Sequence, residues 1–143
     1  MKKWIFGLII AGVLVFLAWF VLFISPLRIC CGPLDEKPDL IKITSPQSGA
    51  VVKSPLLVEG EARGFWFFEA RFPVKLIDER GNLIVQGIAQ AQDEWMTENF
   101  VPFQATLEFS TFATSGFLVL EKDNPSGLPE NSDEVRRAVR FKN

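Results

Sequence analysis

The chain has 143 residues, of which 48% are apolar and 22% are charged, and its formal net charge is −2. This length suits one folded domain of ordinary size and excludes a large multidomain enzyme. The sequence contains no histidine, which excludes histidine-based general base catalysis and the usual catalytic zinc sites.

The first part of the chain is a predicted membrane anchor. Trp4–Ile24 is a run of 21 residues with 19 apolar side chains, two glycines and no charge. As a helix it rises about 31 Å, which matches a hydrocarbon core of roughly 30 Å, so its predicted partner is the lipid bilayer. Lys2 and Lys3 place residues 1–3 in the cytoplasm. A cleaved signal peptide is the alternative, but the run is long for one and no small-x-small cleavage site follows it.

Residues 25–39 are the predicted juxtamembrane linker. Ser25-Pro26 ends the apolar helix because proline cannot continue it. The only cysteines, Cys30 and Cys31, are adjacent, and neighbouring cysteines rarely pair with each other because their Cα atoms lie too close. An intermolecular disulfide or acylation beside the bilayer is one interpretation. We favour the other, in which they are two small apolar residues of a linker.

The remaining chain is acidic and is predicted to lie outside the cytoplasmic membrane. Residues 35–143 carry 12 basic and 17 acidic side chains, a net charge of −5, which excludes a basic nucleic-acid-binding domain. Four basic residues between positions 136 and 142 follow two acids. Alternation assigns Arg140 and Lys142 to the exposed face of the last strand, where charge discourages edge pairing.

Short runs of β-branched and aromatic residues between turn residues predict an all-β domain over residues 40–142. In Phe100–Phe109, apolar and polar side chains alternate over five pairs, the period of a half-buried strand. Val74–Ile77 and Leu83–Gln90 flank Asp78–Asn82, which predicts a hairpin. About seven strands in a domain of this size predict an immunoglobulin-like antiparallel β-sandwich behind one transmembrane helix. The predicted strands are Leu40–Thr44, Leu56–Glu61, Val74–Ile77, Leu83–Gln90, Phe100–Phe109, Phe117–Lys122 and Val135–Phe141.

Several long strings in this domain resemble a known family. They are ITSPQSGAVVKSPLLVEGEARGFWFFEARFPVKLID, AQAQDEWMT, FVPFQATLEF and LVLEKDNPSGLPEN, in family order. Over about Leu40–Phe141 the chain resembles the bacterial spore germination immunoglobulin-like domain, also described as a GerM-associated domain. The resemblance implies an immunoglobulin-like sandwich, an extracytoplasmic bacterial protein and a binding or envelope role, with no established enzyme activity. Members named for germination often carry a GerM-type domain, which is not found in this sequence, so a germination role is not implied.

The segment Gly64–Phe72 holds five aromatic residues in nine. Strict alternation would put Phe65 and Phe67 on one face of a strand and Trp66 and Phe68 on the other. The two faces of a sheet in an open two-sheet domain cannot both be fully shielded from water. Trp66 is therefore either a core tryptophan, as in other immunoglobulin-like sandwiches, or part of an aromatic platform that contacts a sugar or a peptide. We retain it as a candidate contact residue.

Trp95 and Met96 are a second candidate contact. They lie in Asp93–Asn99, among three acids and an asparagine, which is unusual for a purely solvated loop. Trp95 either covers one end of the sandwich core or is a hot-spot residue for a partner.

Residues 121–134 contain five acids and two asparagines. The two prolines in this stretch favour a rigid, solvated loop with side-chain turns at its asparagines. A partner contact through Asp123 and Asn124 is one alternative. A weak calcium site formed by Asp123, Asn124, Glu130 and Asp133 is another, although the spacing is not that of an EF-hand.

No nucleophile elbow, phosphate-binding loop or dinucleotide fingerprint is present, so we predict no catalytic residue, no cofactor and no enzyme activity. The predicted function is a membrane-anchored extracytoplasmic binding domain that contacts another envelope protein or a surface component. A cell-wall glycan-binding or glycan-processing accessory domain is the alternative, and a structural scaffold is the third. The candidate contact residues are Trp66, Trp95, Met96, Asp123 and Asn124.

Overall fold

The alternation of apolar and polar side chains determines how each strand faces the core. In the computed structural model, which describes residues 36–142, β3 and β6 bury every second residue along their lengths. Strands with one buried face pack in layers. The elements are β1 (Ile41–Ser45), β2 (Ala50–Val52), β3 (Leu56–Arg63), the 3₁₀ helix η1 (Gly64–Trp66), β4 (Arg71–Asp78), β5 (Leu83–Ala91), β6 (Phe100–Leu107), β7 (Ser115–Glu121), the 3₁₀ helix η2 (Pro129–Asn131) and β8 (Glu134–Phe141).

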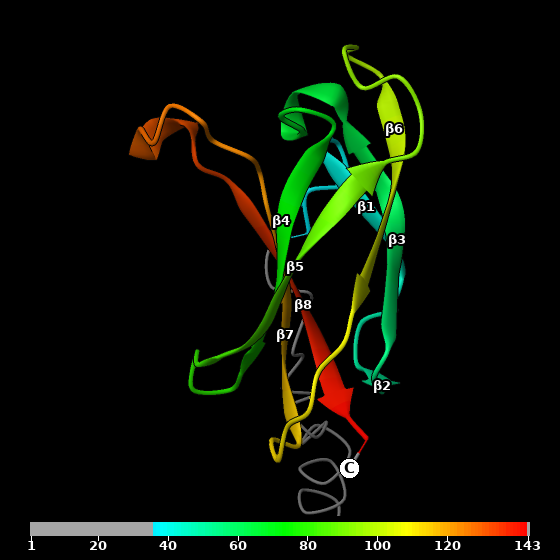
Figure 1. Ribbon diagram of the computed structural model, residues 1–143, viewed down its shortest axis with the longest axis vertical. Helices are drawn as coiled ribbons and strands as arrows, with labels where there is room; N and C mark the ends of the chain where they lie inside the picture. Colours follow the sequence, from blue (N-terminus) through cyan, green and yellow to red (C-terminus); the bar gives the residue numbers. More distant parts are fainter. Residues whose placement is uncertain (1–35, 143) are drawn as a thin grey trace, which may run out of the picture. The chain divides into compact units, whose positions relative to one another are not determined.

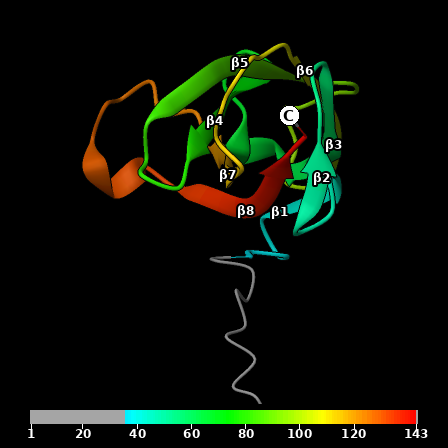
Figure 2. The ribbon, with the colours of Figure 1, turned by 90° about the horizontal axis from the view of Figure 1, so that it is seen from below.

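The strands form one curled sheet with the order β1-β3-β6-β5-β4-β7-β8-β2. Figure 2 shows that the sheet curls until β1 and β3 lie close to β8 and β2. Along the other seam, β5 pairs with β6 only through Gln90–Gln104 and Ala91–Phe103. The arrangement is therefore sandwich-like, with a short ladder between β5 and β6 joining its two layers.

The all-β prediction is confirmed, and each of the seven predicted strands corresponds to an observed one. The strand count and the purely antiparallel arrangement were wrong. An eighth strand, β2, pairs in parallel with β8 from Ala50–Val139 to Val52–Phe141. Three residues are too few to show an alternation, so the sequence pattern could not identify β2.

Aromatic rings fill the core beside the start of β4. Phe72 of β4 is fully buried. Its ring contacts Phe67 edge-to-face at a centroid distance of 5.2 Å, and Phe103 of β6 at 4.9 Å. Such pairs add to the free energy that the buried area itself supplies. This cluster ties the turn before β4 to the opposite layer.

The predicted hairpin between β4 and β5 is confirmed. Its turn is organised by Asp78, whose carboxylate accepts hydrogen bonds from the side-chain and backbone amides of Asn82 and from the backbone amide of Arg80, each at 2.8 Å. These bonds, those from Asn82 first, hold the pKa of Asp78 below its ordinary value because they stabilise the charged form.

The predicted anchor Trp4–Ile24, the cytoplasmic residues 1–3 and the cysteine pair lie outside the described residues. Within residues 36–142, no helix is both long and apolar enough to span a bilayer.

The chain before β1 is fastened to β8 by ion pairs. Arg137 is 8% exposed and donates hydrogen bonds to the carbonyls of Ile43 (2.6 Å) and Pro46 (3.1 Å) and to the carboxylate of Glu36 (3.0 Å). Lys37 pairs with the carboxylate of Asp133. Both terminal nitrogens of the guanidinium are used in this way, which makes its burial tolerable, while its Nε has no hydrogen-bond partner within residues 36–142. Two residues of the predicted linker are thus bound to the folded domain.

Replacing Arg137 tests how much this buried contact contributes to stability. Arg137→Ala removes the donors that satisfy two carbonyls, and we expect the free energy of unfolding to fall by about 2–4 kcal/mol. The neighbouring Arg136 is half-exposed and pairs with Glu134, so Arg136→Ala should cost less than about 1 kcal/mol. Urea denaturation measures both, and equal losses would contradict a special role for Arg137.

Candidate functional site

Three segments that are distant in sequence meet at one end of the sandwich, which we call the linker end: residues 64–70, 92–99 and 122–133. They lie at the upper end of Figure 1. Gly64 donates its amide hydrogen to the Asn99 carbonyl at 3.2 Å, and Asp123 donates to the Trp66 carbonyl at 3.1 Å. The segment 64–70 is therefore hydrogen-bonded to both of the other two. It positions every loop of this end.

The chain enters the domain at the same end. Arg63, the last residue of β3, donates to the Asp39 carbonyl at 3.0 Å and to the Glu98 carbonyl at 3.2 Å. Its guanidinium also lies over the ring of Phe100, 4.1 Å from the centroid, a favourable cation–π geometry. One side chain thus joins the segment before β1 to residues 92–99.

Trp66 is not a surface residue, and its assignment as a contact residue was wrong. Its side chain is fully buried, and it lies on η1 rather than on a strand. A 3₁₀ turn advances three residues per turn instead of alternating. Trp66 and Phe67 consequently face the core, while Phe65 and Phe68 are 50% and 41% exposed. The interpretation of Trp66 as a core residue is the one that fits.

Trp95 and Met96 occupy different environments although they are adjacent. Trp95 is half-buried and packs against the core, whereas Met96 is 74% exposed. Close backbone packing fixes the loop, because a Cβ atom on Gly64 would lie only 2.3 Å from the Trp95 carbonyl oxygen and 1.9 Å from that of Thr97. Only glycine fits at this position. Trp95 therefore covers the end of the core and presents Met96 to solvent.

The predicted rigid loop after β7 is held by a side-chain hydrogen-bond network. The Asn124 amide donates to the Leu128 carbonyl at 2.8 Å and to the Ser132 hydroxyl at 2.9 Å. The Ser126 hydroxyl donates to the side-chain oxygen Oδ1 of Asn124 at 2.5 Å and accepts from the side-chain amide of Asn131 at 3.0 Å. Asn124 thus serves the loop's own structure, while its place on the loop remains accessible.

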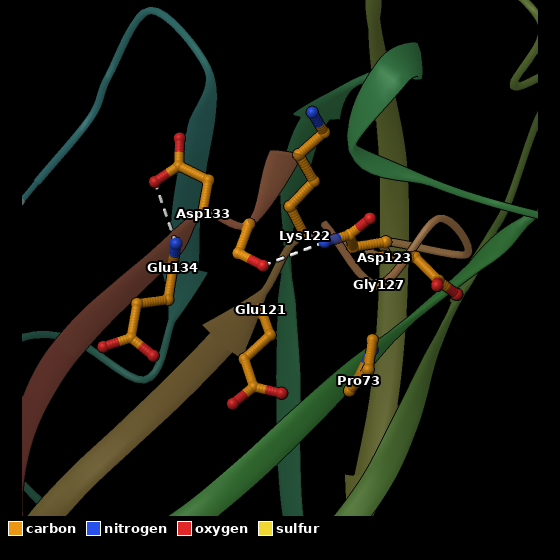
Figure 3. Close-up of a pocket in the computed structure, with 9 residues that line it drawn as sticks. Pro73, Glu121, Lys122, Asp123, Gly127, Asp133 and Glu134 are labelled. Carbon is orange, nitrogen blue, oxygen red and sulfur yellow. Dashed lines mark hydrogen bonds between the residues drawn. The ribbon is translucent and has the colours of Figure 1, made fainter. Parts of the chain in front are cut away.

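Beside this loop lies a polar hollow of about 610 Å³. Figure 3 shows Glu121 and Lys122 extending in opposite directions from the end of β7, with Pro73 of β4 below them. Glu121 is ion-paired with Lys75 at 2.6 Å. The residues that line the hollow are Pro73, Glu121, Lys122, Asp123, Asn124, Gly127, Ser132, Asp133 and Glu134.

The calcium alternative gains no support from this geometry. Within residues 36–142, no three acidic or cysteine side chains converge closely enough to hold a metal ion. Asp133 is engaged by Lys37, and Asn124 uses its amide within the loop. Of the proposed ligands, Asp123 and Glu130 remain without an ion pair in the described part of the chain.

The linker end therefore carries several exposed apolar side chains on hydrogen-bonded loops. Sequence reasoning identified Met96 but did not select Phe65, Phe68 or Leu128. The aromatic density of Gly64–Phe72 was the signal for the two phenylalanines, but strand alternation distributed them incorrectly. The exposed members of this end are Phe65 (50%), Phe68 (41%), Met96 (74%) and Leu128 (50%).

A family model described as the immunoglobulin-like domain of bacterial spore germination matches residues 40–127. The chain belongs to this family. The match begins just before β1 and includes β7 and the first part of residues 122–133, so the family domain contains most of the linker end. Membership suggests a non-catalytic binding or interaction domain. No curated protein matches the chain, and no solved structure matches it.

Truncating the two adjacent residues separately tests this division of roles. Trp95→Ala removes a ring that packs against the core, and we expect the free energy of unfolding to fall by about 1–3 kcal/mol. Met96→Ala removes a solvated side chain and should change it by less than about 0.5 kcal/mol. Thermal and urea unfolding followed by circular dichroism measure the two. A larger loss for Met96→Ala would show that the assignment is reversed.

Proposed function

We propose that the protein is a single-pass membrane protein whose C-terminal family domain lies outside the cytoplasmic membrane. This domain binds another envelope protein or a surface component through the linker end. The observation that carries the proposal is that four exposed apolar side chains lie on the segments of this end, whose backbones are fixed by hydrogen bonds. Most of a protein's exposed apolar residues are scattered, and a cluster on a pre-organised surface is typical of a binding site.

The short linker between the proposed anchor and the domain favours the linker end as the binding surface. Residues 25–35 follow the proposed anchor Trp4–Ile24 and span at most about 40 Å when fully extended. Glu36 is paired with Arg137 of β8 and Lys37 with Asp133 just before β8, so the domain is held by its linker end. A short tether raises the effective concentration of the domain against other membrane-bound molecules. A weak interface then suffices for function.

A binding role is also favoured over catalysis because acidic side chains of the hollow are engaged in ion pairs. The hollow beside residues 122–133 contains three acids that form ion pairs with basic side chains of the domain, so they serve the fold. The glycan-binding alternative relied on exposed aromatic residues, of which Phe65 and Phe68 are exposed. Because Trp66 is fully buried, that alternative has lost its main aromatic contact.

Site-specific photo-crosslinking in the intact membrane tests the proposed function. A crosslinking amino acid replaces Met96 at the linker end or, as a matched control, Phe112, which is fully exposed on the loop between β6 and β7. We expect one defined envelope component to be captured from position 96 and not from position 112. Equal capture from both positions, or from 112 alone, would contradict the choice of this end.

A further inference from the structure

We propose that the linker end binds a basic amphipathic segment of its protein partner, one that presents aliphatic side chains flanked by lysine or arginine. This inference rests on the proposed function and specifies the chemistry of the partner. It depends on two features of the same surface: exposed apolar side chains, and acidic side chains that the domain leaves without ion pairs.

The apolar feature is fixed in place before any partner binds. Phe65 and Phe68 flank the buried Trp66 and Phe67, and the backbone then turns sharply through Glu69 and Ala70, which have positive φ angles of 50° and 63°. Non-glycine residues adopt this conformation only where the surrounding structure holds it. The rings are therefore presented without a large further loss of conformational entropy on binding.

The acidic feature belongs to residues 92–99. Asp93, Glu94 and Glu98 are all exposed, and no lysine or arginine of residues 36–142 forms an ion pair with any of them. Within residues 36–142, the Asp93 and Glu94 carboxylates accept hydrogen bonds from backbone amides of their own loop. Met96, the most exposed apolar residue of this end, therefore lies in a loop with three acidic side chains that form no ion pair within residues 36–142.

Charge complementarity selects among the possible occupants. A second copy of this chain would bring three like charges against three, which opposes association. An anionic lipid surface would be repelled by the same loop. A basic amphipathic segment satisfies both features, because its aliphatic side chains cover Met96 and the phenylalanines while its cations face Asp93, Glu94 and Glu98.

Binding of a synthetic peptide to the full chain in a neutral detergent tests this. The probe is a fluorescently labelled amphipathic helix of lysine and leucine, and its counterpart has glutamate in place of lysine. Fluorescence anisotropy should show binding of the lysine peptide only, with affinity falling about tenfold between low salt and roughly 0.5 M salt. Equal binding of the two peptides would overturn the proposal, as would tighter binding to anionic vesicles than to the lysine peptide.

A pair of matched double variants locates the binding site. Met96→Ser with Glu98→Gln removes one apolar and one acidic side chain at the linker end, and we expect about a tenfold loss of affinity. Phe112→Ser with Glu108→Gln removes the same chemistry from the loop between β6 and β7 and should leave affinity within about twofold. All four residues are exposed, and circular dichroism checks that both variants fold.

Equal losses in the two variants would overturn the proposal, because general acidity of the domain would then explain the binding. The proposed function is tested separately. If crosslinking from position 96 captures a defined component while the lysine peptide binds no better than its counterpart, this inference is wrong and the proposed function stands.

Discussion

The burial of Trp66 is the constraint on which the rest of the linker end depends. Because the ring is fully buried, η1 is held against the core and the position of its backbone is fixed. The Trp66 carbonyl then accepts from Asp123 and the Gly64 amide donates to Asn99, so two loops from different layers are anchored to one short turn. The ring's Nε1 has no hydrogen-bond partner within the described residues, a cost that large apolar burial outweighs.

Most of the fold could be predicted because its strands are long enough to alternate. Five of the eight strands, β1, β3, β4, β6 and β8, alternate between buried and more exposed residues, and the β4–β5 hairpin has a recognisable turn sequence. β2 could not be predicted, because its three residues become a strand only when β8, far along the chain, lies beside them. Long-range pairing of this kind leaves no local signal.

The same alternation, applied to the last strand, distinguishes Arg137 from the three other basic residues between positions 136 and 142. Arg137 is in phase with Val135 and Val139 on β8, so the pattern that buries the valines buries the arginine too. Its environment could not be predicted, since its acceptors are the carbonyls of Ile43 and Pro46. Met96, predicted as a contact residue, is exposed on its loop. Trp66 was misassigned as a contact residue because a 3₁₀ turn replaced the expected strand.

Two sets of contacts hold different segments of the chain at the linker end. Arg137 and Asp133 hold residues 36 and 37 on the β8 side, while Arg63 holds the Asp39 carbonyl and the loop that carries Met96. The segment just before β1 is therefore held by Arg137 and Asp133 independently of the hydrogen bonds of β1 itself. Loops that carry exposed apolar groups stay ordered only if their backbone is held independently of the partner. The linker end meets that condition, because its apolar side chains project from segments whose backbone is already bound to the core.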